Sequence, residues 1–276
     1  MIKLIDNMAI IGGDNELPLL AYKALKKKYK NSVYINLSFK NKKYLKAKSS
    51  YNLKIFELEK CIRLLNDHHV KKICFLGTVS RPNFNKLKLD RVLKKYINEI
   101  ILSSKKGDGF ILDSIINIFR KEGFEIFSFI DIFSDEFLLD SEYLKPSNID
   151  LKDIDKGRKI LDSLSDFDNA QACVVSNGYV LAIEAAEGTD RMLNRLPQVK
   201  KKIARYDIDE GCLIKLPKIN QSLKIDLPTV GIKTIELMSK SKLIFLAVNQ
   251  KQTIVVNKAE FYKKLKKEKI GLSFIS

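Results

Sequence analysis

The segment Met8-Ala-Ile-Ile-Gly-Gly13 predicts the fold of the first half of this chain. Four apolar residues in a row are typical of a short buried strand, and the two glycines end it. A helical pattern follows over residues 17–30. A strand that turns at glycines into a helix is the opening unit of an α/β fold, in which helices cover a parallel sheet.

The same alternation continues to about residue 129. Further strands are predicted at 32–37, 73–76 and 125–129, and helices at 54–66, 86–102 and 108–121. We therefore predict a Rossmann-like α/β domain over residues 1–133. Ligands bind at the carboxyl ends of the strands in such sheets. The segments Gly12-Gly13 and Gly77–Arg81 fall at that edge.

The second half predicts a different architecture. Residues 134–150 show no clear period and are expected to form a linker. An α+β domain is predicted over 151–276, beginning with a helix at 151–164. Residues 171–186 read as a hairpin whose turn is Asn177-Gly178, a strong short-range signal. A strand at 212–215, a helix after Pro228, strands at 243–248 and 253–256 and a basic helix complete the prediction.

Composition excludes several classes of protein. The chain has 276 residues, a hydrophobic content of 45% and a net charge of +17. It has no apolar run long enough to span a membrane and no signal-peptide pattern at its start, so we expect a cytoplasmic protein. The four cysteines are widely spaced among apolar residues, which favours reduced core thiols. The only histidines, His68 and His69, are expected to end a helix; they cannot supply a histidine-rich metal site.

The positive charge has more than one explanation. It comes mainly from lysines spread along the chain, which a compositional bias of an AT-rich genome would also produce. The densest patches, Lys23–Lys30 and Lys263–Lys267, are either solvated helix faces or contacts to an anionic membrane surface. Nucleic-acid binding is not predicted, because aromatic residues are not interleaved with the basic runs.

Two N-terminal segments are candidates for phosphate binding. Gly12 and Gly13 either approach a phosphate or form a tight strand-to-helix turn, and the sequence leaves both open. No P-loop motif is present. Ser80 and Arg81 follow a strand and precede Pro82, and a guanidinium there could grip a phosphate as a bidentate fork. Alternatively, Arg81 forms an ion pair between loops.

The strongest chemical signal is the segment Glu184-Ala-Ala-Glu-Gly-Thr-Asp-Arg191, which opens a predicted helix. Its acids, with Asp226 further along, are hard oxygen ligands that suit Mg²⁺ or Mn²⁺. Acidic residues are also common at helix starts for electrostatic reasons. The co-occurrence favours a metal site, for which the candidate ligands are Glu187, Asp190 and Asp226. Candidates for substrate binding in the same half are Thr189, Lys215, Lys218 and Thr229.

The chain resembles the LpxI family of UDP-2,3-diacylglucosamine pyrophosphatases of lipid A synthesis. The matching segments are Ile11-Gly-Gly13 with Leu17-Pro18, Gly77–Pro82, Lys106-Gly-Asp108, Glu184–Asp190 and Asp226-Leu-Pro-Thr-Val-Gly231. The E-x-x-E-G-T-D and D-L-P-T-x-G elements are specific. The chain departs from the family before Asp226, where residues 218–226 lack a proline, an acid and an arginine, although Lys224 retains a cation.

The resemblance implies a two-domain cytoplasmic enzyme of a Gram-negative bacterium. It implies hydrolysis of UDP-2,3-diacylglucosamine to UMP and 2,3-diacylglucosamine 1-phosphate (lipid X), assisted by Mg²⁺ or Mn²⁺, with the lipid held between the domains. By match, Asp226 falls on the aspartate whose loss disables such enzymes, and Glu187 and Asp190 are carried over as site residues. Because the substrate is a lipid, we expect peripheral contact with the anionic inner membrane.

Two other functions stay open. A nucleotide-sugar binding or transferase protein would use the glycine turn without hydrolysis, and would release UDP rather than UMP. A non-enzymatic nucleic-acid binder is favoured by net charge alone and would show a steep salt dependence. The sequence leaves open the acyl-chain length, which phosphorus is attacked, the exact metal ligands and whether the protein is a homodimer.

Overall fold

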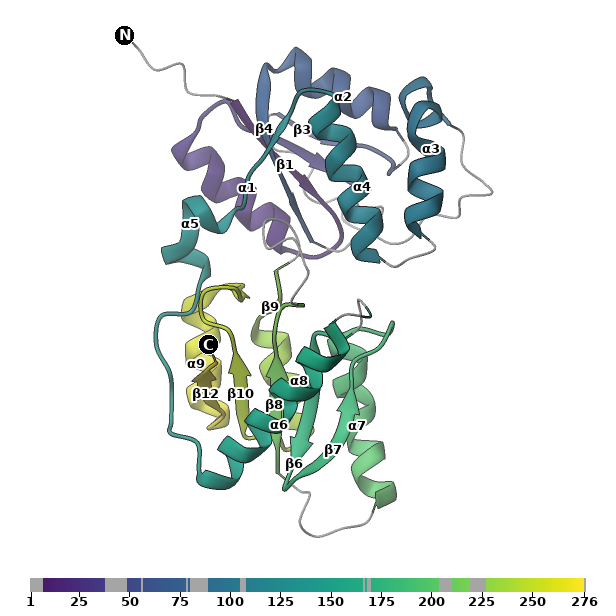
Figure 1. The fold of residues 1–276 in the computed structure, drawn as a ribbon. Helices are drawn as coiled ribbons and strands as arrows, with labels where there is room; N and C mark the ends of the chain where they lie inside the picture. The colour runs from purple at the N-terminus through teal and green to yellow at the C-terminus, as the bar shows by residue number, and fades with distance from the viewer. Residues whose placement is uncertain are drawn as a thin grey trace. The chain divides into compact units, whose positions relative to one another are not determined.

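The computed structural model describes residues 7–37, 49–55, 57–77, 79, 89–104, 108–165, 167, 170–203, 210–218 and 227–275. The chain divides into two compact units, Met1–Ile132 and Phe133–Ser276, each with its own sheet (Figure 1). Each unit has its own sheet and its own core.

The first unit contains a five-stranded parallel sheet in the order β3-β2-β1-β4-β5. The strands are β1 (Asn7–Gly12), β2 (Val33–Asn36), β3 (Ser50–Asn52), β4 (Val70–Leu76) and β5 (Glu125–Ile126). The chain moves outward from β1 to β3 and then returns to the other side of β1 with β4. This reversal between β1 and β4 is the switch point at which doubly wound sheets bind ligands. The Rossmann-like prediction is confirmed.

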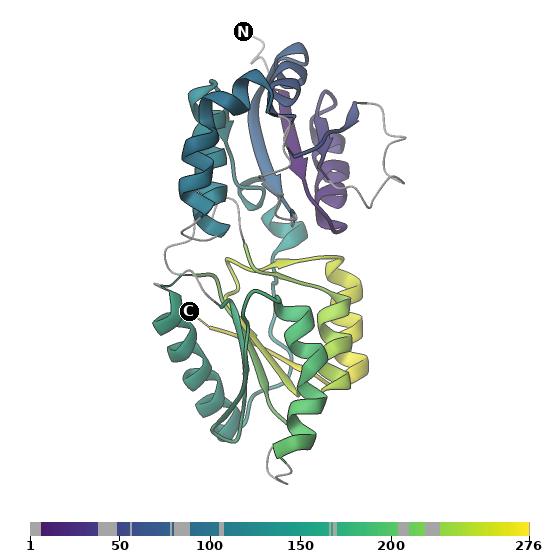
Figure 2. The same ribbon diagram turned by 90° about the vertical axis from the view of Figure 1, so that its right-hand side faces the viewer.

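Helices cover both faces of this sheet. They are α1 (Leu17–Lys28), α2 (Leu58–Asp67), α3 (Arg91–Ser104) and α4 (Asp108–Lys121). Figure 2 shows α1 on one side of the sheet and the antiparallel pair α3 and α4 on the other. Leu25, Ile62 and Ile118 are among the side chains buried by these helices. In α2, three of the periodic apolar residues that predicted the helix, Leu58, Ile62 and Leu65, are buried.

Sequence analysis missed two short strands of the second unit, Thr229–Val230 and Gly271–Phe274, and two elements earlier in the chain. Strand β3 has only three residues and no alternation of apolar and polar side chains. Helix α5 (Ile130–Phe137) follows β5, contains a kink at Phe133 and buries Phe133 and Phe137. The second half of α5 and the start of α6 (Asn148–Ser165) lie within residues 134–150, which were expected to form a linker.

The second unit contains a mixed sheet in the order β12-β10-β8-β6-β7. Its strands are β6 (Ala172–Ser176), β7 (Tyr179–Ile183), β8 (Cys212–Lys215), β10 (Phe245–Val248) and β12 (Gly271–Phe274). Strand β10 pairs in parallel with β8 and β12, whereas β6 is antiparallel to both β7 and β8. A separate parallel pair joins β9 (Thr229–Val230) to β11 (Ile254–Val255).

The predicted β6–β7 hairpin is confirmed. Asn177 and Gly178 both have positive φ, 46° and 80°, as a two-residue type I′ turn requires. The carboxylate of Asp153 on α6 accepts hydrogen bonds of 2.7 Å from both of their N–H groups. The hairpin turn is thereby fastened to the helix that packs beside it.

Helices also cover both faces of the second sheet, as Figure 2 shows. On one face lie α7 (Thr189–Ile203), α8 (Ile232–Lys240) and α9 (Lys258–Glu268), and on the other lies α6. Alternate residues of β6 serve the two cores: Val174 packs on the side of α7 to α9, and Cys173 on the side of α6. The predicted mixture of helices, hairpin and strands is therefore a three-layer unit.

The cysteine prediction is confirmed, because Cys61, Cys74, Cys173 and Cys212 are all free and buried. In the part of the chain that the structure describes, no helix has the length and apolar character needed to cross a membrane.

Candidate active site

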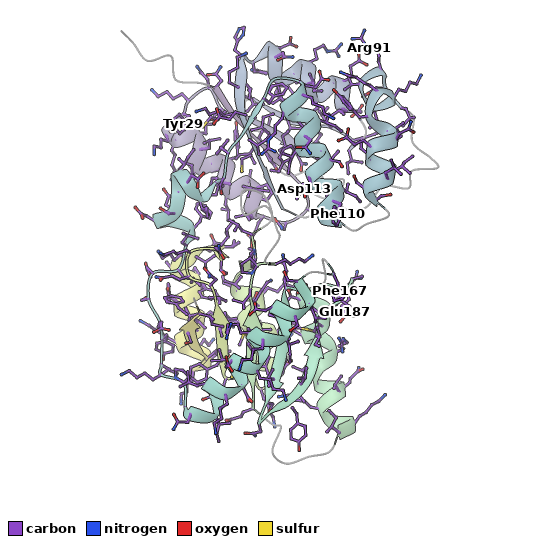
Figure 3. The ribbon with its side chains drawn as sticks, viewed as in Figure 1. Tyr29, Arg91, Phe110, Asp113, Phe167 and Glu187 are labelled. Carbon is purple, nitrogen blue, oxygen red and sulfur yellow. The ribbon has the colours of Figure 1, made fainter. Side chains whose placement is uncertain are left out.

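One edge of the second sheet gathers most of the predicted site residues that the structure describes. Strands β7, β8, β10 and β12 run in the same direction, so their carboxyl ends lie at a common edge. Strand β7 ends there at Ile183 and leads into Glu184–Gly188, and β8 ends at Lys215. Figure 3 shows Glu187 at this end of the unit.

The turn from β7 into α7 depends on Gly188. This residue has φ +80°, in the left-handed region that favours glycine. The turn is braced by Glu184, which the sequence analysis did not assign to the site. One Glu184 oxygen accepts a 3.1 Å hydrogen bond from the buried Thr189 hydroxyl, and the other accepts one of 3.3 Å from the Gln171 N–H. Glu184 therefore links the start of α7 to the strand beside it.

Glu187, in the turn before α7, forms an ion pair with a cation of that helix. The Arg195 guanidinium contacts the Glu187 carboxylate at 2.7 and 2.8 Å and also donates to the carbonyl of Ile183 at 3.2 Å. Arg195 lies in the second turn of α7, and its guanidinium reaches back to the turn that precedes the helix. The spacing of eight residues is not one of the helical pair spacings, so the sequence did not indicate this pair.

Asp190 lies in the first turn of α7 and pairs with a residue of α8. Its carboxylate is 2.6 Å from the Lys233 ammonium. The two residues are 43 positions apart in sequence, and nothing in the sequence around Asp190 or around Lys233 indicated the contact. The pair joins the segment that follows β7 to the segment that follows β9.

Lys215 and Thr229, both predicted to bind substrate, are brought together. The Lys215 ammonium donates a 2.9 Å hydrogen bond to the Thr229 carbonyl. The Lys215 side chain is buried, whereas Lys218 is half-buried three residues further along. The segment that contains Thr229 is held on its other side by β11, because Ile254 donates to Pro228 and Val256 donates to Val230.

The described carboxylates do not by themselves form a metal site. No group of three His, Cys, Asp or Glu side chains suited to a metal occurs among the residues that the structure describes. Glu187 and Asp190 are each already neutralised by a cation, Arg195 or Lys233. The third predicted ligand, Asp226, lies outside the described residues.

At the carboxyl edge of the first sheet, Gly12 and Gly77 are required by close packing. A Cβ on Gly12 would lie 2.3 Å from the Pro18 side chain, and one on Gly77, where φ is +78°, would lie 2.7 Å from it. The Gly13 N–H donates to the Leu76 carbonyl at 3.0 Å, so this donor is used by the fold. Ser80 and Arg81 lie outside the described residues.

A pocket of about 380 Å³ lies at the opposite, amino edge of the first sheet. It is lined by Asn7, the first residue of β1, by residues before β2 and β4, including Asn31 and His69, and by none of the predicted site residues. As predicted, the two histidines follow a helix: α2 ends at Asp67, and His68 bonds the Tyr51 hydroxyl at 2.5 Å.

Comparison with known proteins identifies the family. The LpxI N-terminal domain model matches residues 7–135, and the LpxI C-terminal domain model matches residues 141–273. A curated relative, the UDP-2,3-diacylglucosamine pyrophosphatase LpxI of Caulobacter vibrioides, is 33% identical over 207 residues, which cover 74% of each chain. With both of its halves matched in order, the chain belongs to the LpxI family.

Proposed function

We propose that this protein hydrolyses the pyrophosphate bond of UDP-2,3-diacylglucosamine in lipid A biosynthesis. The observation that carries the proposal is the match of both units to LpxI domains, together with a relative of that printed activity. The reaction consumes one water and gives UMP and 2,3-diacylglucosamine 1-phosphate. One P–O bond of the bridging oxygen breaks, and the water oxygen forms a new P–O bond to the phosphorus that is attacked.

The carboxyl edge of the second sheet suits the charge of this substrate. A diphosphate carries negative charge that accumulates on the leaving phosphate as the bond breaks, and fixed cations at that point lower the barrier. We propose that these cations are Lys215, whose ammonium bonds the Thr229 carbonyl, and Lys218. Asp226 is our first choice for orienting or activating the water, with Glu187 and Asp190 as further acidic residues of the site.

We include Mg²⁺ or Mn²⁺ in the proposal because of the substrate. Such ions neutralise adjacent phosphates and lower the pKa of a bound water. Glu187, Asp190 and Asp226 are the residues proposed to hold the ion. Glu187 and Asp190 are each paired with a cation in the structure. The proposal of a metal ion therefore rests on the chemistry of the diphosphate substrate and not on a cluster of ligands.

The first unit is proposed to contact the nucleotide or phosphate part of the substrate. Gly12 and Gly13 lie at the switch point of its sheet, the place where such sheets bind ligands. Ser80 and Arg81, which follow β4 in sequence, are proposed as further phosphate contacts.

Membrane contact, a cytoplasmic location and a homodimer are also proposals. Lys23, Lys27 and Lys28 on α1 and Lys263, Lys266 and Lys267 on α9 are exposed, and each basic residue near an anionic surface adds about 1 kcal/mol of attraction. Sedimentation with anionic vesicles at low and high salt tests the membrane contact. Absence of binding at both salt concentrations would remove it.

One assay tests the main proposal. The protein is incubated with UDP-2,3-diacylglucosamine, with Mg²⁺ or with chelator, and nucleotide products are separated. We expect UMP and lipid X with Mg²⁺ and little turnover with chelator. Release of UDP instead of UMP would support the transferase alternative. Oxygen-18 water would then show which product carries the new oxygen.

A further inference from the structure

Lys233 occupies an unusual position for a cation. It lies in the first turn of α8, where the helix dipole favours negative charge and disfavours positive charge. Its side chain is 71% exposed, and its ion-pair partner Asp190 is 47% exposed. Exposed ion pairs of this kind contribute about 0–1 kcal/mol to stability. Folding therefore gives little reason for a lysine here.

The surroundings of Lys233 suggest a functional reason for a lysine at this position. It lies two residues after Gly231, in the segment that begins with Thr229, whose carbonyl accepts the Lys215 hydrogen bond. Asp190 connects it to the first turn of α7. The Thr229–Gly231 segment thus accepts the Lys215 hydrogen bond from β8 and leads directly into the first turn of α8, which carries Lys233.

The amino ends of α7 and α8 meet at this point through the Asp190–Lys233 pair. Free N–H groups at helix amino ends attract anions. The buried Lys215 adds an ammonium that contacts the Thr229 carbonyl, four residues before Lys233 in sequence. Two helix amino ends and two ammonium groups at one edge are an arrangement suited to an anion with more than one negative charge.

We propose that Lys233 is a diphosphate-binding residue, which Asp190 holds at the site until substrate arrives. The proposal rests on the proposed function and adds a residue to its substrate contacts. Because the Asp190 pair is exposed and weak, a phosphate with greater negative charge can replace the carboxylate as the partner of the ammonium. The ion pair thus keeps the lysine in place at little energetic cost.

The test compares Lys233→Met with Lys240→Met, a matched exposed lysine in the last turn of the same helix. A lost charge-assisted hydrogen bond predicts that Lys233→Met raises KM about tenfold. We expect kcat to change less than KM, and Lys240→Met to match wild type in both. Lys233→Arg should recover most of the affinity, because it retains the positive charge.

Inhibition constants separate phosphate binding from a structural effect. Lys233→Met should weaken inhibition by UMP and by inorganic pyrophosphate in parallel, and leave the weaker binding of uridine unchanged. An equal loss for uridine, or an unchanged KM in an active protein, would overturn the proposal for Lys233 alone. If wild type releases no UMP, the proposed function fails instead. In that case calorimetry with inorganic pyrophosphate still decides whether Lys233→Met weakens binding of the anion.

Discussion

The Lys215 ammonium donates a 2.9 Å hydrogen bond to the carbonyl oxygen of Thr229. The Lys215 side chain is only 8% exposed, and it ends a strand in the middle of the sheet. The bond connects this strand to Thr229, the threonine of the D-L-P-T-V-G segment. The buried ammonium thus lies at the carboxyl end of a central strand, at the edge where the other described site candidates of this unit gather, which supports the proposed role in the reaction.

We therefore expect Lys215→Met to lower kcat/KM about 100-fold, the scale reported for removal of one donor that stabilises developing charge. Methionine has similar length and suits a buried site, so Tm should change by a few degrees or less. Steady-state kinetics and a thermal melt measure both. Lys251→Met, an exposed lysine in the turn after β10, is the control. Unchanged kinetics in Lys215→Met would remove it from the site.

The Arg195–Glu187 contact predicts a positioning effect. Arg195→Gln removes the bonds to Glu187 and to the Ile183 carbonyl, and it should loosen the turn that precedes α7. We expect kcat/KM to fall about tenfold, since misplacement of a site residue commonly costs at least that much. Arg195→Lys should restore part of the loss. The neighbouring Arg191→Gln on the same helix serves as control, and an equal loss in both variants would contradict a specific role for Arg195.

Asp153 fastens the β6–β7 hairpin to α6, so its substitution should lower the stability of the protein. Asp153 is 3% exposed and accepts two N–H groups at 2.7 Å. Asp153→Ala should lower the free energy of unfolding by about 2 kcal/mol, because hydrogen bonds to charged groups are worth about 1.5–3 kcal/mol and water can reach the exposed turn in the variant. Chemical denaturation measures the change. Asp155→Ala, which removes only surface ion pairs with Arg158 and Lys159, should cost much less.

The Tyr96–Glu122 contact predicts a pH-dependent contribution to stability. The Tyr96 hydroxyl donates a 2.8 Å hydrogen bond to Glu122 and, with Lys95, holds the pKa of that carboxyl below its usual value. A carboxyl with a lowered folded-state pKa stabilises the protein above the unfolded pKa of about 4.3. That stabilisation is lost as pH falls through the folded pKa. Tyr96→Phe should therefore cost about 1 kcal/mol at pH 7.

Melting curves from pH 3 to pH 7 test this. The difference in Tm between wild type and Tyr96→Phe should shrink below about pH 4. A difference that is constant over this range would show that Tyr96 acts through packing alone.

The buried cysteines predict slow thiol chemistry. Burial raises the pKa of Cys61 and of Cys173 to about 12 and raises those of Cys74 and Cys212 as well. Because the thiolate is the reactive form, iodoacetamide at pH 8 should leave the folded protein unmodified and label four thiols in denaturant. Mass spectrometry counts the labels. Rapid labelling of any one thiol in the folded state would contradict the buried environment.

Several elements were predictable because their signals are local. The Met8–Gly13 segment gave a buried strand with a glycine turn, and Asn177-Gly178 gave the hairpin with positive φ at both positions. Helix α4 and strand β8 have the predicted bounds. Strand β3 and helix α5 were missed because neither has a clean period and each forms only against neighbours distant in sequence.

For the site, sequence determined the residue types and the family. The spacing of residues within a motif is given by the sequence itself, so the Glu184–Asp190 and Thr229–Gly231 motifs could be recognised without coordinates. Only the tertiary structure decided which side chains of the site contact one another. The contacts of Lys215 with Thr229 and of Asp190 with Lys233 join elements far apart in the chain. Such pairings depend on the order and direction of strands in the sheet, which local propensity does not encode.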